Sequence, residues 1–310
     1  MGTPSLSRVS EGLTSSVEAP GIDPGLVFAP LGMLRADPTL RLGPRQMVRA
    51  TWTPHGPGTI AIAWGSESGH ISVECRGDGA DWLLERAELL LGARDDVSTF
   101  RPEGIVGRLW SRFRTDRVGA TGTVWHDLIW FVAQQRVRGV DAAAQWRRLV
   151  TTFGECCDQE SGLYFPPAPE RLSRAAPWAL RSIGIDGRRA TTLIEAARVA
   201  HRLHTLADMP HMDVTRPLQS IPGVGPWTAA CLSATTWGEP DTVIVGDSGI
   251  PSLIASTLAG DRWADDARMN ELLEPYRPHR YRVLRLALAS RMQGHRDHGR
   301  WNQGHQIQGH

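Results

Sequence analysis

The sequence predicts a protein of two parts, an N-terminal α+β part built on an antiparallel sheet with a helix, followed by an all-α part. Short segments that alternate apolar and polar residues fill the region from about residue 26 to residue 73. One amphipathic helical pattern follows over 81–91, and the periodicity is helical from residue 105 onward. We therefore expect a flexible arm over 1–24, the sheet part over 25–104, the helical part over 105–293 and a flexible, histidine-rich tail over 294–310.

Turns rich in glycine, proline and histidine separate the predicted strands of the first part, and the segment 54–58 is one of them. In the helix that follows, Leu83, Ala87 and Leu90 share one side, so this helix can cover one face of a sheet. The predicted strands lie within 39–42, 47–52, 59–64 and 70–73.

Helix start and stop residues divide the second part. Thr123 can cap a helix over 124–137, and Gly154 ends the next one, over 141–153. Pro226 stands at a helix start, where the missing N–H costs nothing. Further helices are predicted over 170–182, 188–206, 213–219, 226–236, 249–259, 264–274 and 279–292.

The distribution of charge indicates where a polyanion would bind. The formal net charge of the 310-residue chain is +1, but residues 105–210 carry fifteen arginines against ten acidic residues, whereas residues 1–104 carry nine against thirteen. A polyanionic partner is expected to meet the second part, although solvated helix faces account for the same counts equally well. No apolar run is long enough to cross a bilayer and no signal peptide is recognisable, so we expect a cytoplasmic protein without membrane contact.

The cysteine and lysine content excludes several chemistries. The four cysteines form no C-x-x-C pair, so we expect no zinc, no iron–sulfur cluster and no other cofactor. The chain contains no lysine, and all 34 of its basic residues are arginine. No side-chain amine can therefore form a Schiff base with a substrate.

The segment 218–247 carries the clearest functional pattern. Two predicted helices meet there at a hairpin that contains Gly223 and Gly225. Glycine permits positive φ angles and close approach by another molecule. The second helix starts directly after the hairpin, so its free N–H groups and the positive end of its dipole can bind a phosphate. For the spacing alone, a plain turn between two helices is the better explanation.

The same segment resembles the hairpin of the helix–hairpin–helix DNA glycosylase superfamily, L-x-x-[IFL]-P-G-[IV]-G-x-[WK]-T-A. Residues 218–229 match every defined position, and Asp247 follows 22 residues after Gly225. Further segments, within about 105–292, resemble the bacterial 3-methyladenine DNA glycosylase II group. That group has an N-terminal sheet domain of TATA-binding-protein-like shape, and the resemblance implies the same for the first part of this chain. The further matching segments are 134–137, 184–190 and 274–281.

The resemblance implies that Asp247 is the catalytic residue. Cleavage of an N-glycosidic bond develops oxocarbenium charge on the deoxyribose, and a nearby carboxylate can stabilise it and can orient or deprotonate the attacking water. Asp247 can also cap the helix that begins near Ser248, and the two roles are compatible. Trp227 occupies the position where relatives with lyase activity carry lysine. Together with the absence of lysine, this implies a monofunctional enzyme that uses water.

A base pocket and DNA contacts are implied in the same way. Trp227, Cys231 and Ser248 are expected in the pocket, with Trp227 facing an alkylated base or belonging to the helix core. The group usually has an aromatic residue where this chain has Ser248, which leaves the substrate range open. Arg136 is expected to fill the gap left by a flipped base, or else to form a surface ion pair. The expected DNA contacts are Gly223, Val224, Gly225, Thr228, Gln135, Arg136, Arg188, Arg189, Arg277 and Arg280.

These features favour a monofunctional glycosylase that flips and excises alkylated purines, such as 3-methyladenine and 7-methylguanine, from double-stranded DNA in base excision repair. Such bases are cationic and leave readily, so one carboxylate and a flipping pocket suffice. One alternative is a non-catalytic protein of the same fold that binds damaged DNA. Another is a glycosylase for oxidised or mismatched bases, which the lack of lysine and of a cysteine cluster disfavours. We expect a monomer associated with the nucleoid.

Overall fold

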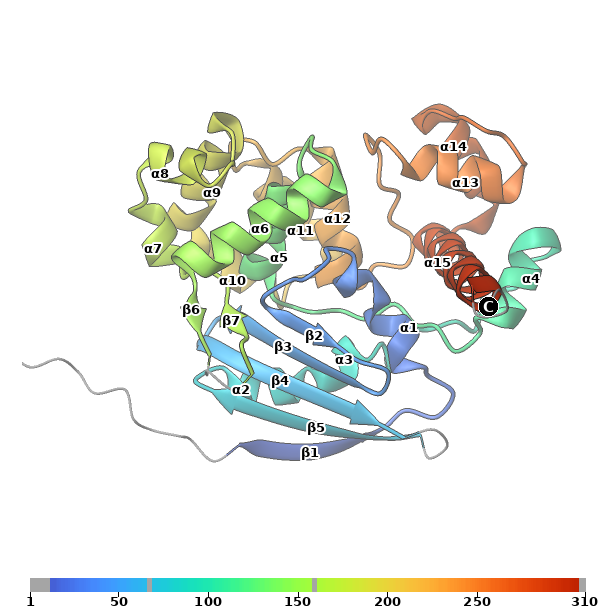
Figure 1. The fold of residues 1–310 in the computed structure, drawn as a ribbon, viewed down its shortest axis with the longest axis horizontal. Coiled ribbons are helices and arrows are strands. Elements are labelled where there is room, and N and C mark those ends of the chain that lie inside the picture. The colour runs from blue at the N-terminus through green and yellow to red at the C-terminus, as the bar shows by residue number, and fades with distance from the viewer. Residues whose placement is uncertain (1–11, 66–68, 158–160, 307–310) are drawn as a thin grey trace, which may run out of the picture.

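The computed structural model describes residues 12–65, 69–157 and 161–306, and of 294–306 it describes the backbone. An antiparallel sheet with strand order β1-β5-β4-β3-β2 forms one layer, and most of the helices lie above it (Figure 1). The four predicted strands are all present, as β2 to β5. The strands of this sheet are β1 (Leu13–Glu18), β2 (Leu40–Leu42), β3 (Gln46–Thr53), β4 (Gly56–Trp64) and β5 (His70–Gly77).

The register of the sheet follows from its apolar residues. Met47 of β3 pairs with Ile62 of β4, and Ile62 pairs in turn with Val73 of β5. These three side chains are buried on one face, because residues that pair directly across antiparallel strands point to the same side. Helices α2 (Ala80–Glu85) and α3 (Ala87–Leu90) pack on this face and close an apolar core.

Strand β1 corrects the expectation of a flexible arm over 1–24. It pairs with β5 along its whole length, with Leu13 opposite Cys75 and Glu18 opposite His70. Val17 is its single buried residue, so no apolar alternation marks this strand in the sequence, and backbone pairing to β5 defines it. Two short helices follow it, α1 (Pro24–Phe28) and the 3-10 helix η1 (Ala29–Gly32). Residues 1–11 lie outside the described residues.

Helix α5 is the centre of the second apolar core, and ten consecutive residues of it, from Val124 to Ala133, are buried. Helices α6, α9, α10 and α12 and strand β3 contact it. The helices of this part are α4 (Gly104–Arg112), α5 (Val124–Gln134), α6 (Gly139–Phe153), α7 (Pro169–Ser173), α8 (Pro177–Ser182), α9 (Gly187–Arg198), α10 (Ala200–Leu206), α11 (His211–Gln219), α12 (Pro226–Thr236), α13 (Ile250–Leu258), α14 (Asp266–Leu273), the 3-10 helix η2 (Glu274–Tyr276) and α15 (Arg280–Gln306).

Several boundaries differ from the predicted ones. The helix expected over 170–182 is divided into α7 and α8, because Pro177 cannot continue a helix that precedes it. The helix expected over 188–206 is divided at Val199, whose φ of −109° and ψ of 11° are not helical. Helix α4 and a two-stranded hairpin of β6 (Glu155–Cys156) and β7 (Tyr164–Phe165) were not predicted.

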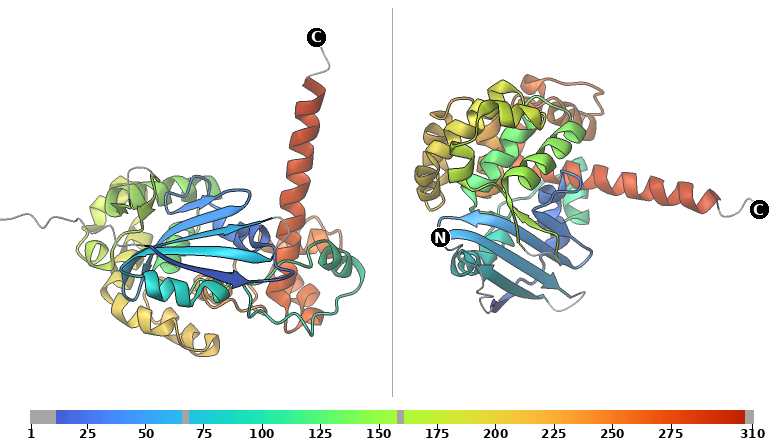
Figure 2. Two further views of the ribbon diagram at one scale, coloured as in Figure 1. Left: turned by 90° about the horizontal axis from the view of Figure 1, so that it is seen from below. Right: turned by 60° about the vertical axis from the view of Figure 1, so that its left-hand side comes forward.

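Helix α15 corrects the expectation of a flexible tail from residue 294, because its backbone stays helical to Gln306. The helix projects well beyond the rest of the molecule (Figure 2). Residues 307–310 lie outside the described residues. No helix in the described ranges is both long and apolar enough to span a membrane.

Candidate active site

A pocket of about 220 Å³ lies where the sheet part meets the helices. Its walls come from the segment around η1 and β2, from α5 and α12, and from α13 and α15. Four aromatic side chains line it, together with a few polar groups, and this is the usual composition of a small-molecule site. The aromatic residues are Trp130, Phe131, Trp227 and Tyr281.

Three hydrogen bonds hold Asp247 at this pocket. The indole Nε1 of Trp227 donates to Oδ2 at 3.0 Å, and the backbone N–H groups of Gly249 and Ile250 donate to Oδ1 at 2.8 and 2.9 Å. The carboxylate therefore closes the turn that leads into α13, whose N-cap residue is Gly249, and it also lines the pocket. Asp247 accepts N–H groups at the start of α13 without being its N-cap residue, and the carboxylate stays open to the pocket.

Two of the three residues expected in the base pocket line it. Trp227 packs edge to face against Phe131, with ring centroids 6.1 Å apart. Cys231 is buried, and this burial, reinforced by the negative charge of Asp247, raises the pKa of its thiol well above the usual value, so the thiol stays neutral. Ser248 is exposed and is not among the residues that line the pocket, which corrects its assignment. The turn closed by the Asp247 carboxylate leaves this residue in solvent.

The hairpin between α11 and α12 uses its two glycines differently. Gly223 has a φ of +89°, and a Cβ there would lie 1.9 Å from Thr192 Oγ1, so the fold itself requires glycine. Gly225 has a φ of −96°, and a Cβ there would enter open space. No side chain caps the helix at Gly225, so the first N–H groups of α12 face an open surface. That arrangement suits an anion.

Val224 does not contribute its N–H to this surface as expected. The group donates instead to Ile221 O at 3.0 Å inside the turn, and the Val224 side chain is buried. Thr228 is also buried, with 1% of its surface exposed, so its side chain cannot reach DNA. Its backbone N–H lies in the first turn of α12.

Gln135 connects the end of α5 to the hairpin. Its Nε2 donates to Gly223 O at 3.1 Å and to Thr228 Oγ1 at 2.9 Å, so it positions the hairpin. Arg136 follows with a φ of +56°, in the left-handed region that non-glycine residues rarely adopt. Such strain is typical of functional sites. Arg136 is exposed, and no acidic group of the described residues lies within ion-pair distance of it.

Four further arginines were expected to contact phosphates. For two of them the structure contradicts this expectation. Arg189 is 3% exposed and donates to Asp186 and to Ala133 O. Arg280 is also mostly buried and forms a two-pronged ion pair with Asp241, at 2.9 and 2.7 Å. Both guanidinium groups are occupied within the protein and cannot neutralise a phosphate. Arg277 is half-exposed but pairs with Glu274 at 2.6 Å, whereas Arg188 is exposed with no ion-pair partner among the described residues.

A buried polar network that the sequence did not predict lies at the wall of the pocket. Arg49 of β3 pairs with Asp127 of α5 at 2.6 Å, and both side chains are almost fully buried. Thr51 Oγ1 lies at hydrogen-bond distance from His126 Nδ1, at 2.9 Å. Burial, reinforced by the charge of Arg49, lowers the pKa of His126 well below its usual value, so the ring is neutral. In the sequence, the two polar residues His126 and Asp127 inside an otherwise apolar helix indicate this network.

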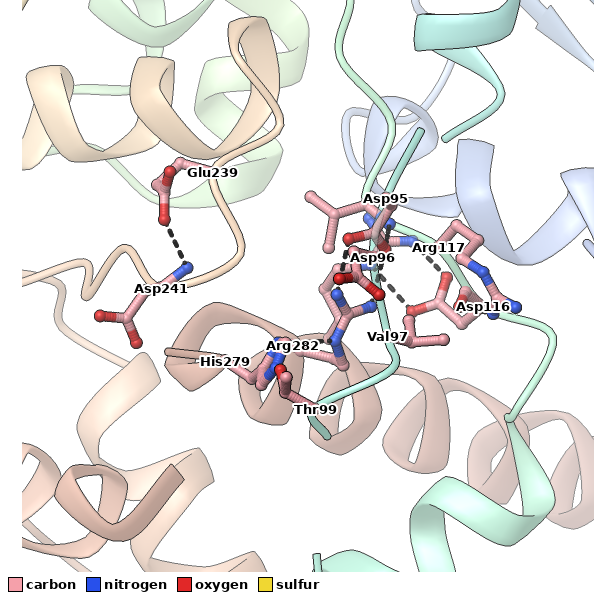
Figure 3. A network of polar contacts seen from close by, with 12 residues as sticks. Asp95, Asp96, Val97, Thr99, Asp116, Arg117, Glu239, Asp241, His279 and Arg282 are labelled. Carbon is pink, nitrogen blue, oxygen red and sulfur yellow. Dashed lines mark hydrogen bonds and ion pairs between the residues drawn. The ribbon is translucent and has the colours of Figure 1, made fainter. Parts of the chain in front are cut away.

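Ion pairs and a hydrogen bond hold α15, which forms one wall of the pocket, against neighbouring segments. Arg282 Nη2 lies 2.6 Å from Asp95 Oδ1, and Thr99 Oγ1 lies 2.7 Å from His279 Nε2 (Figure 3). Arg285 pairs with Asp116 at 2.5 Å farther along the same helix. The contacts with Asp95 and Thr99 join the start of α15 to the segment between α3 and α4, and the contact with Asp116 joins α15 to the segment between α4 and α5.

Comparisons with known proteins agree with this geometry. No protein-family model matches the chain. The fold is similar to that of a 3-methyladenine DNA-glycosylase from Archaeoglobus fulgidus, with a TM-score of 0.74 and 19% identity over 89% of this chain and 98% of that one. Over 176 residues the chain is 27% identical to DNA-3-methyladenine glycosylase 2 of Escherichia coli (strain K12), which covers 56% of this chain and 61% of the relative.

A second sequence relative is a protein of Bacillus subtilis (strain 168), provisionally named DNA-3-methyladenine glycosylase YfjP. It is 30% identical over 136 residues, which are 42% of this chain and 46% of the relative. The matches thus span roughly half of the length of these two relatives. The two sequence relatives confirm the resemblance to the helix–hairpin–helix DNA glycosylase superfamily, and the similarity of the fold agrees with it. The two sequence relatives confirm the resemblance to its DNA-3-methyladenine glycosylase group.

Proposed function

We propose that the protein is a monofunctional DNA glycosylase that hydrolytically excises alkylated purines of the 3-methyladenine and 7-methylguanine type from double-stranded DNA. One observation carries the proposal. A carboxylate, Asp247, is fixed by three hydrogen bonds at an aromatic-lined pocket, and the helix that provides one of these bonds starts at the hairpin. The names of the two sequence relatives support the same substrate class.

Binding begins at the hairpin. The open surface at Gly225 admits a DNA phosphate to the first N–H groups of α12, where hydrogen bonding and the helix dipole both favour an anion. Arg136, exposed at the end of α5, fills the gap in the base stack when the damaged nucleotide leaves it. Arg188 adds a phosphate contact. The flipped base then enters the pocket among the aromatic rings.

Asp247 acts on the sugar of the flipped nucleotide. The bond between C1′ and N9 breaks and its electron pair moves to N9, which neutralises a cationic base. The positive charge that develops on the deoxyribose is stabilised by the carboxylate. Water adds to C1′ and gives up a proton, which the carboxylate accepts and passes to solvent. Water is the nucleophile because the chain has no lysine to form a Schiff base.

Incubation of the protein with methylated duplex DNA tests this proposal. We expect chromatography to detect free 3-methyladenine or 7-methylguanine, and the strand to break only after alkali treatment. An unmethylated duplex of the same sequence is the control. Strand breaks without alkali would contradict hydrolysis, and tight binding without base release would favour the non-catalytic damaged-DNA-binding protein. Light scattering of the complex with a single-lesion duplex is expected to give one protein molecule per DNA.

We also propose that the sheet part has the TATA-binding-protein-like shape of the group and that the division between the two parts falls near residue 104. The separation of the buried apolar residues into two clusters supports this division.

A further inference from the structure

Asp37 is a buried carboxylate of the pocket that the proposed reaction does not use. It lies between η1 and β2, lines the pocket and is 8% exposed. Its Oδ1 accepts hydrogen bonds from the N–H and the hydroxyl of Thr39, at 2.8 and 2.7 Å. Its Oδ2 accepts one from Trp130 Nε1 at 3.1 Å. Since an ionised carboxylate accepts about four hydrogen bonds, Oδ2 can still accept one from a group in the pocket.

Within the described residues, no cationic side chain forms an ion pair with Asp37. Arg49 also lines the pocket, but its charge is balanced by Asp127 at 2.6 Å. His126 Nε2 lies 3.4 Å from Thr39 Oγ1, and its ring is neutral because burial lowers its pKa. A buried carboxylate without a counter-charge is unfavourable, and a cationic ligand would relieve this cost.

The pocket as a whole has an excess of negative charge. Three carboxylates and two guanidinium groups line it. One carboxylate is neutralised by Arg49, so Asp37 and Asp247 remain against Arg291, which is exposed on α15. Two carboxylates among aromatic rings are suited to two positive charges, one on the base and one that develops on the sugar.

We propose that Asp37 binds the positively charged ring of the flipped base and so selects cationic N-alkylated purines over neutral bases. This inference rests on the proposed function. It names Asp37 as the residue that determines which bases the enzyme selects. The aromatic walls can stack on any base, whereas a carboxylate distinguishes bases by charge and by the N–H groups that they donate. Thr39 holds Oδ1 of this carboxylate through two hydrogen bonds, and the indole N–H of Trp130 adds one to Oδ2.

Asp37 is expected to act on binding rather than on bond cleavage. The base is cationic when it enters and loses its charge as the electron pair of the C1′–N9 bond moves onto N9. Its attraction to Asp37 is therefore strongest before the reaction and weaker in the transition state. An interaction of this kind lowers KM without raising kcat. Asp247 acts on the opposite side of the same bond, where charge increases during the reaction.

The variant Asp37→Asn tests the inference, with Asp23→Asn as the matched control. Asp23 Oδ1 also accepts an N–H from two residues ahead, Gly25 at 2.9 Å, and Asp23 is not among the residues that line the pocket. For methylated duplex DNA, Asp37→Asn is expected to raise KM about tenfold, the factor for one charge-assisted contact, with kcat unchanged or higher. Asp23→Asn is expected to match the wild type, and thermal melting of each variant reports folding.

A titration of tryptophan fluorescence measures the same preference without catalysis. At mildly acidic pH, the wild type is expected to bind N7-methylguanosine, a cation, about tenfold more tightly than guanosine, and Asp37→Asn to lose this preference. Equal binding of both nucleosides by the wild type, or an intact preference in Asp37→Asn, would overturn the inference. A protein that prefers the cation but releases no base from DNA would contradict the proposed function and leave the inference supported.

Trp130→Phe keeps the test decisive if Asp37→Asn fails to fold. This variant removes the indole N–H and leaves the Asp37 carboxylate in the pocket, so the preference for N7-methylguanosine is expected to persist. Loss of the preference in Trp130→Phe would show that the indole, and not the carboxylate, provides the selectivity, and would contradict the inference.

Discussion

The indole Nε1 of Trp227 donates a 3.0 Å hydrogen bond to Oδ2 of Asp247, twenty residues farther along the chain. The second residue of α12 thereby fixes the orientation of the carboxylate at the start of α13. The resemblance described from the sequence implies that relatives with lyase activity have a lysine at the position of Trp227. In this protein the same position provides a donor that orients Asp247 and cannot attack the sugar.

Asp247→Asn is expected to lower the rate of base excision by at least about 100-fold, because it removes the negative charge that stabilises the oxocarbenium ion. The asparagine carbonyl can still accept the N–H groups of Gly249 and Ile250, so the melting temperature is expected to stay close to that of the wild type. Asp265→Asn is the matched control, since Asp265 caps α14 through Arg268 N at 2.9 Å. Full activity of Asp247→Asn would refute the catalytic role.

Trp227→Phe is expected to lower kcat about tenfold, the equivalent of one net hydrogen bond, with a smaller change in KM. Phenylalanine keeps the edge-to-face contact with Phe131 but no longer orients Asp247. Single-turnover rates on methylated DNA measure the effect. Trp237→Phe removes a comparable bond, from its Nε1 to Leu206 O at 3.2 Å, just after the other end of α12. Equal losses in both variants would argue against a specific role for Trp227.

The two hairpin glycines are expected to respond differently to alanine. Gly223→Ala forces a Cβ against Thr192 and a left-handed backbone on alanine, so the free energy of unfolding should fall by about 2 kcal/mol or more. Gly225→Ala should leave stability unchanged or raise it by about 0.5 kcal/mol. It should still weaken DNA binding, because its methyl group occupies the surface that a phosphate approaches. Thermal melting and fluorescence anisotropy with a labelled duplex separate the effects. Unaltered DNA affinity in Gly225→Ala would contradict the phosphate site.

The neutral ring of His126 predicts how stability depends on pH. Its pKa in the folded protein is lower than the usual 6.5, so below that pH the unfolded chain binds a proton that the folded protein does not. The free energy of unfolding should therefore decrease as the pH falls below about 6.5, until the folded protein is protonated too. One such group contributes at most about 1.4 kcal/mol per pH unit.

Urea unfolding of the wild type and of His126→Asn across this range measures the slope. The asparagine side chain can still form a hydrogen bond with the Thr51 hydroxyl, but it does not titrate, so the slope is expected to become shallower. His201→Asn, at an exposed site on α10, is expected to keep the wild-type slope. Identical slopes for the wild type and His126→Asn would show that His126 does not cause the dependence.

The sequence predicted the elements whose signals are local. The bounds of α12 agree with the prediction residue by residue, because Pro226 and the hairpin glycines specify where the helix begins. Strand β1 was not predicted, because its side chains are mostly exposed and its partner β5 lies more than fifty residues away. The division between α9 and α10 at Val199 has no glycine or proline to mark it.

The contiguous pattern at 218–247 was sufficient to indicate the hairpin, the helix start and the carboxylate, because neighbouring residues alone define them. Long-range contacts determined which of the other charged side chains are free at the surface and which are paired inside the protein. Arg189 is held inside the protein by a hydrogen bond to Ala133 O, 56 residues away. The charge of Arg280 is neutralised by Asp241, 39 residues away. The same kind of contact, between Trp130 and Asp37 across 93 residues, sets a second carboxylate in the pocket. Burial and ion pairing depend on which distant segments pack together, and the residues adjacent in sequence do not indicate which segments these are.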